Sequence, residues 1–115
     1  MLKYSEIKEV FNDNNIDIIE YNDETNDDID LPLVVYIAQD GESFSADNVN
    51  YFNFLRVAVV LLDETMNFFM QRQIESVFYQ SETYFEKNVT FAEDERLYSI
   101  TYIIQVIDDE PIESI

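Results

Sequence analysis

Residues 22 to 30, NDETNDDID, place five carboxylates in nine positions with no cation among them. Oxygen ligands of this kind suit Ca²⁺, and an EF-hand loop needs them at loop positions 1, 3, 5 and 12, with Gly at position 6. A loop that starts at Asp13 has Ile18 at position 6, and one that starts at Asp23 has Val34 at position 12. We therefore expect no metal site, and we interpret the run as a solvated acidic loop.

Groups for nucleophilic catalysis are scarce in the whole chain. It has no His and no Cys, so no side chain titrates near neutral pH without a perturbed pKa, and no Ser-His or Cys-His pair can form. A pair of carboxylates could act as acid and base, but 25 acidic residues offer so many pairs that none is indicated. Gly41 is the single glycine, which excludes a glycine-rich phosphate-binding loop. We expect a protein that is not an enzyme and uses no cofactor.

The charge balance restricts the partners. Twenty-five acidic residues against six basic ones give a formal net charge of −19. Binding to nucleic acid or to an anionic membrane needs clustered cations, and here the cations are scattered along the chain: Lys3, Lys8, Arg56, Arg72, Lys87 and Arg96. We expect no direct binding to DNA, RNA or membranes. The acidic body suits a basic partner, or a role in which repelling nucleic acid is useful.

The length of 115 residues predicts one domain, 1–115, large enough for a core of its own. A hydrophobic content of 47%, with 15% aromatic residues, indicates that the negative charge lies on a folded body. No N-terminal apolar segment and no run of 18 apolar residues is present, so we expect neither classical export nor a membrane span.

The spacing of apolar residues predicts a helix, two strands, a further long strand, a second helix and two closing strands. Asp63 is expected to cap the second helix, whose Met66, Phe69, Met70, Ile74, Val77 and Phe78 would form a core stripe. Asp40-Gly41 is expected to start a turn. The order predicts an α+β fold with a mostly antiparallel β-sheet and two α-helices packed on one face. The expected ranges are helices at 2–13 and 63–81 and strands at 16–21, 31–39, 49–62, 83–91 and 97–107.

The strand at 49–62 is too long for a compact domain of this size. Fourteen residues at about 3.4 Å each span roughly 48 Å, whereas a compact domain would be roughly 34 Å across. Its two faces are both largely apolar. Either it is a central strand covered on both sides within one domain, or part of it pairs with or packs on a neighbouring subunit. The candidate interface residues are Tyr51, Phe52, Phe54, Arg56 and Val57.

Four segments carry a family resemblance: Pro32 to Tyr36, the FSADN stretch from Phe44 to Asn48, the aromatic strand from Tyr51 to Leu62, and the acidic step from Glu93 to Tyr98. With their order along the chain, they resemble the small tail-terminator (head-tail joining, or tail completion) proteins of long-tailed bacteriophages of Gram-positive bacteria. The resemblance implies a non-enzymatic ring of six subunits that caps the tail tube and joins it to the DNA-filled head. Its partners would be copies of itself, the major tail tube protein and a head-tail connector protein. Its place would be the head-tail junction of the virion, after assembly in the host cytoplasm.

Such a ring offers a use for the acidic residues. DNA must pass through the bore, and a negative wall repels phosphates so that DNA does not stick while it slides. The same acids could instead lie on the outer rim, contact a partner, or form a plain solvated loop. The candidates for the channel or a partner-facing surface are Asp23, Glu24, Asp27, Asp28, Asp30, Asp40, Glu42, Asp108, Asp109 and Glu110.

Two other functions stay open. One is an acidic DNA mimic that inhibits a DNA-binding protein by occupying its basic groove. A mimic needs acids arrayed on a solvent face, whereas many acids here fall in expected loops. The other is a different head-tail connector, an adaptor or a stopper.

Overall fold

The computed structural model describes residues 1–21, 30–45 and 51–109, and for residues 40–45 and 51–53 it describes the backbone alone. In this part of the chain a five-stranded sheet combines with two α-helices, which is the predicted α+β class. The elements in chain order are the 3₁₀ turn η1 (Tyr4–Glu6), α1 (Ile7–Asp13), β1 (Ile19–Glu20), β2 (Leu33–Ser45), β3 (Tyr51–Asp63), α2 (Phe68–Gln80), β4 (Phe85–Ala92) and β5 (Leu97–Ile107).

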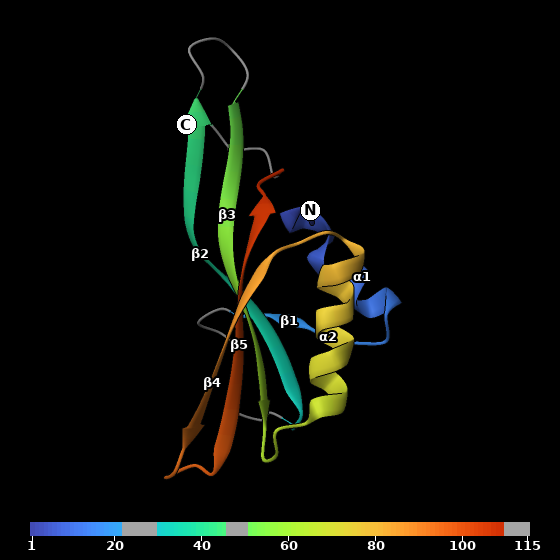
Figure 1. Ribbon diagram of the computed structural model, residues 1–115, viewed down its shortest axis with the longest axis vertical. Coiled ribbons are helices and arrows are strands. Elements are labelled where there is room, and N and C mark those ends of the chain that lie inside the picture. Colours follow the sequence, from blue (N-terminus) through green and yellow to red (C-terminus); the bar gives the residue numbers. More distant parts are fainter. Residues whose placement is uncertain (22–29, 46–50, 110–115) are drawn as a thin grey trace.

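The strands lie in the order β1-β2-β3-β5-β4. The short β1 runs parallel to β2, and the other three pairs are antiparallel. Figure 1 shows both helices on the same side of the sheet, as the sequence predicted. The N-terminal segment is tied to the end of β5, where the Ile107 N–H donates to the Leu2 carbonyl at 2.9 Å.

The long central strand predicted over 49–62 is confirmed as β3. It makes the molecule elongated, with extents of 50 × 31 × 25 Å and a radius of gyration of 15.4 Å, where a compact chain of this length has about 13 Å. At their far end β2 and β3 continue past β5, whose last paired residue, Ile107, lies opposite Phe54 (Figure 1). The domain is therefore elongated in the direction of β3, which is one continuous strand from Tyr51 to Asp63.

The core fills the space between the sheet and the helices. Alternate residues of β5 are buried there, from Ile100 to Val106, as one core-facing side of a strand requires. Phe78 of α2 lies at the centre, with ring centroids 6.0 Å from Phe11 and 5.5 Å from Tyr102 in edge-on contacts. Each such side chain contributes about 1.5–3 kcal/mol through burial. The other core residues from α1, β3 and α2 are Ile7, Val57, Val59, Leu61, Ile74 and Val77.

The turn predicted at Asp40-Gly41 is wrong. Both residues lie inside β2, which continues to Ser45. The register shifts between Ala38 and Asp40, so the polar segment begins with a β-bulge at Gln39 and then pairs again with β3. The long partner strand offers backbone hydrogen bonds over this whole stretch, and this pairing overrides the local turn preference.

The predicted cap of the second helix is also wrong. Asn67 caps α2 instead of Asp63, with a left-handed backbone (φ 47°, ψ 62°) and a side-chain oxygen that accepts from the Met70 N–H at 3.1 Å. Asp63 remains in β3 and accepts a 2.8 Å hydrogen bond from the Asn67 side chain. Asn tolerates the left-handed conformation better than most residues, so it can both turn the chain and cap the helix.

Two smaller predictions need correction. Phe69 was expected in the core stripe but is 71% exposed, because it lies two residues before buried Gln71 and so about 200° around the helix. The strand expected at 16–21 is paired only at Ile19 and Glu20, although Ile16 and Ile18 are buried.

Candidate subunit interface on the helix-free sheet face

The sheet face turned away from α1 and α2 is largely apolar at its centre. Strand pairing aligns Ile37, Ala58 and Ile103 in one row across β2, β3 and β5. The next row aligns Val35, Val60 and Thr101. Val35 and Ala58 are buried, whereas Ile37, Val60 and Ile103 are half-buried. This surface, which we call the helix-free face, therefore presents partly accessible apolar side chains in the middle of the sheet.

A groove of about 490 Å³ borders the helix-free face. Phe54 and Arg56 of β3 line it together with Ile103 and Gln105 of β5, and Arg56 is paired in register with Gln105. Further lining residues are Met1, Gln39, Tyr84, Glu86 and Ile104. An aromatic ring and an arginine beside aliphatic side chains are typical of the residues that anchor protein–protein contacts. The groove holds the side chains for binding, but no His or Cys for nucleophilic chemistry.

Two of the five predicted interface residues, Phe54 and Arg56, thus come together in this groove. Val57 points to the opposite side, where it is fully buried in the core, and we leave it out of the candidate interface. Tyr51 and Phe52 lie in β3 opposite Ser45 and Phe44, and their side chains are outside the described part. Sequence reasoning missed Ile103 and Glu86. The alternation of β5 placed Ile103 on the side away from the core, but only the strand register puts it beside Arg56 and Ala58.

The predicted acidic residues fall at different ends of the sheet. Asp40 and Glu42 lie in β2 at register positions opposite Arg56 and Phe54, and Asp108 and Asp109 follow β5 directly after Ile107. Since Phe54 pairs with both Glu42 and Ile107, these four acids lie toward the same end of the sheet. Asp30 is exposed and precedes β2 at the other end. Asp23, Glu24, Asp27, Asp28 and Glu110 lie outside the described residues.

Asp109 has a defined structural role. Its carboxylate accepts hydrogen bonds from the Ser5 hydroxyl at 2.5 Å and from the Ser5 backbone N–H at 3.1 Å. These bonds stabilise the charged form and hold the pKa of Asp109 below its ordinary value. The acid thus ties the end of β5 to the first turn of the chain.

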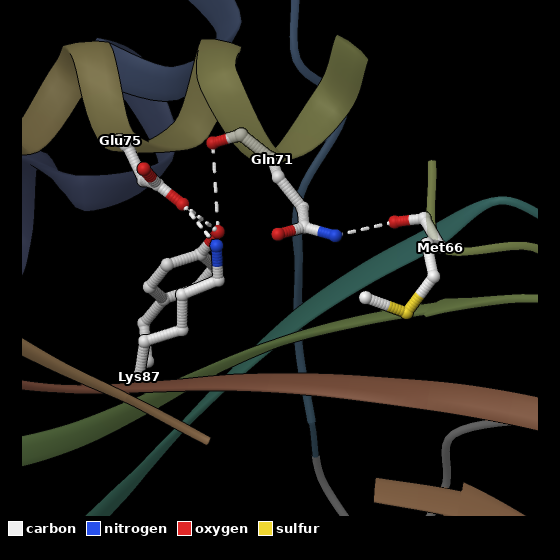
Figure 2. A network of polar contacts seen from close by, with 5 residues as sticks. Met66, Gln71, Glu75 and Lys87 are labelled. Atoms are coloured by element: carbon white, nitrogen blue, oxygen red, sulfur yellow. Dashed lines mark hydrogen bonds and ion pairs between the residues drawn. The ribbon is translucent and has the colours of Figure 1, made fainter. Parts of the chain in front are cut away.

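A polar network fixes α2 against the two strands that border the groove (Figure 2). The Glu75 carboxylate of α2 accepts hydrogen bonds from the Tyr102 hydroxyl of β5 at 2.7 Å and from the Lys87 ammonium of β4 at 2.8 Å. On the same helix, Gln71 is buried and donates its side-chain N–H to the Met66 carbonyl at 2.5 Å. One residue of α2 therefore connects the helix to both closing strands, β4 and β5.

The network shifts the pKa values of its members. Burial raises the pKa of Tyr102 well above its ordinary range, and the hydrogen bond to the Glu75 anion raises it further. For Glu75, burial alone would raise the pKa, but the hydrogen bonds from Lys87 and Tyr102 outweigh it, so the pKa lies below its ordinary value. Glu75 is therefore charged and Tyr102 neutral near pH 7, the states in which the tyrosine donates and the carboxylate accepts.

Within residues 1–21, 30–45 and 51–109, no three His, Cys, Asp or Glu side chains lie close enough together to hold a metal ion. Nor do these residues include a helix with the length and apolar character needed to cross a membrane. Comparison of the chain with models of known protein families and with curated proteins found no match.

Proposed function

We propose that this protein is a non-enzymatic virion structural protein, a tail terminator that forms a ring on the tail tube of a long-tailed phage and joins it to the DNA-filled head. The observation that carries the proposal is the helix-free face with its Phe54–Arg56 groove. Both helices cover the other face, so no described helix occupies this side of an elongated subunit, and a neighbouring chain can pack there. The resemblance of the sequence to tail terminators suggests that this neighbour is another copy of the chain in a ring of six subunits.

The charge fits a ring through which DNA passes. At −19 per chain, a closed ring carries a strong negative field, and a negative bore repels the phosphates of the moving DNA. The acids near the far end of the sheet, Asp40, Glu42, Asp108 and Asp109, are our candidates for the bore or for a surface that contacts the tail tube or the connector. A protein that lets DNA slide past without binding it needs no cluster of basic residues, and the six Lys and Arg residues of this chain are scattered along the sequence.

Solution mass measured at low and high salt tests the ring. Like charges on adjacent subunits oppose closure, and raising the salt from about 20 to 500 mM shortens the Debye length from roughly 20 to 4 Å. We expect light scattering after size exclusion to show more of a hexamer-sized species at high salt, and electron microscopy to show a ring with a central hole. Dissociation of the ring by salt would contradict the proposal.

The same measurement separates the alternatives. A DNA mimic would stay monomeric and bind a basic DNA-binding protein tightly, with an affinity that falls steeply as salt rises. An adaptor or stopper would also form a ring, but it would bind the connector and not the tail tube. Pull-down with purified tail tube protein distinguishes that case from a tail terminator.

A further inference from the structure

The outer edge of β4 is an open strand edge. β4 is the last strand of the sheet, so its outward backbone N–H and C=O groups have no partner strand within the described chain. Every residue from Glu86 to Ala92 is exposed, so no described segment covers the strand. An uncovered edge of eight residues is a template for pairing with another extended strand.

The usual protection of a strand edge is weak here. Natural edge strands are blunted by Lys, Pro, bulges or short length. The five residues from Asn88 to Ala92 contain no charge and no Pro, and the pairing with β5 is continuous from Phe85 to Ala92 without a bulge. The single cation of the strand, Lys87, bonds to Glu75 on the helix side. Two apolar side chains, Val89 and Phe91, are exposed beside this edge.

The other end of the same sheet supplies a matching edge. β1 pairs with β2 only at Val35 and Tyr36, which leaves the outer side of β2 from Ile37 to Ser45 without a partner among the described strands. This unpaired edge of β2 is nine residues long, which is close to the eight residues of β4. Across β2, β3, β5 and β4 every neighbouring pair is antiparallel, so β4 runs opposite to β2. The two open edges lie at different heights along the strands, because Ala38 is level with Phe85 through Val57 and Ile104. A second copy in the same orientation, displaced along the strand direction, would therefore offer its open β2 segment to β4 as an antiparallel partner.

We propose that β4 of one subunit pairs antiparallel with residues 37–45 of β2 in the next subunit, so that the sheet continues from subunit to subunit. The contact is head-to-tail and uses one edge at each end of every copy, as closure of a ring requires. This edge contact is additional to the one proposed for the groove of the helix-free face, and since it joins subunits of the same ring it rests on the proposed function. Backbone hydrogen bonds and the apolar pair Val89 and Phe91 supply an attraction that does not depend on opposite charges, which suits subunits that repel one another.

Engineered cysteines can detect this pairing, because the chain has no Cys of its own. Within one subunit β2 and β4 are separated by two strands, or about 14 Å at the usual strand spacing, too far for a disulfide. We would combine Ala38→Cys with a second cysteine moved one position at a time from Asn88 to Ala92. Under ring-forming conditions and mild oxidation, at least one double variant should give a covalent ladder up to the ring size, whereas each single variant should stay a monomer on a non-reducing gel.

Each other outcome has a definite meaning. A dimer from a single cysteine in β4 would show that two β4 edges pair with each other, and it would overturn the proposal. Rings without a ladder in any double variant would also overturn it, while the tail-terminator function would stand. Absence of any ring, at every salt concentration and with tail tube protein present, would contradict both.

A charge placed on the edge gives an independent test. Thr90→Lys adds an edge lysine, and Thr65→Lys is a matched control in the exposed loop before α2. We expect Thr90→Lys to abolish the ring species with an unchanged melting temperature of the subunit, and Thr65→Lys to keep the ring. Equal ring formation by both variants would overturn the proposal.

Discussion

The hydroxyl of Tyr102 in β5 donates a 2.7 Å hydrogen bond to the Glu75 carboxylate of α2, although the tyrosine ring is fully buried in the core. The carboxylate is thereby held at the boundary between core and solvent, where Lys87 reaches it from β4. This relationship joins the helix layer to both closing strands, and it gives two predictions on stability.

Tyr102→Phe should destabilise the subunit. The change leaves the packed ring in place but removes the donor to Glu75, so a partly buried carboxylate loses a hydrogen bond. We expect a loss of roughly 1–3 kcal/mol in the free energy of unfolding, measured by chemical denaturation. Tyr84→Phe is the matched control, because Tyr84 is 80% exposed. Equal effects of the two variants would show that the hydrogen bond contributes nothing.

The contribution of Glu75 should depend on pH. Its pKa in the folded protein lies below the ordinary value of 4.5, so the charged form stabilises the fold above that value, and the stabilisation is lost as pH falls through the folded pKa. We expect the difference in unfolding free energy between the wild type and Glu75→Gln to be largest near pH 7 and to shrink below about pH 4.5. The other acidic residues are the same in both proteins, so their contributions to the pH dependence of the unfolding free energy cancel in this difference. A difference that is constant from pH 7 to pH 3 would contradict the assignment.

Asn67 should be the residue on which the start of α2 depends. Asn67→Gly removes the cap but accepts the left-handed backbone, whereas Asn67→Ala removes the cap and also adds the cost of that conformation for a residue with a β-carbon. We expect Ala to be less stable than Gly by about 1 kcal/mol in urea denaturation. Equal stability of the two variants would mean that the backbone conformation at this position is not left-handed in solution.

The groove beside the helix-free face should govern self-association and leave folding unaffected. Phe54→Ala and Arg56→Gln remove an aromatic and a cationic anchor, and interface anchors of this kind change affinity by about tenfold or more. We expect the ring to form only at correspondingly higher protein concentration in analytical ultracentrifugation. Arg72→Gln on the exposed side of α2 makes the same charge change away from the groove and should have no effect. A similar loss of association in Arg56→Gln and Arg72→Gln, with no loss in Phe54→Ala, would indicate a general charge effect and would contradict the groove as the interface.

The order and type of the main elements could be predicted from the sequence because local periodicity reports burial. The alternation from Tyr98 to Val106 follows from one buried sheet face, and the spacing of Ile74, Val77 and Phe78 from one buried helix face. The absence of His and Cys and the net charge of −19 are properties of composition, and so are the expectations drawn from them: no catalysis and no nucleic-acid binding.

Tertiary structure decided the features that depend on a partner distant in sequence. Asp40-Gly41 has a local turn preference, but pairing with residues 55 and 56 of β3 holds it in a strand. Asp63 carries a capping side chain, but pairing with Tyr98 keeps it in β3, and the helix begins only after Asn67. The register of β3 against β5 alone brings Arg56, Ile103 and Gln105 to one groove. Local patterns determined which faces are buried, because burial repeats with the period of each element; only long-range pairing determined which residues share a surface, because register is a property of two strands and not of one.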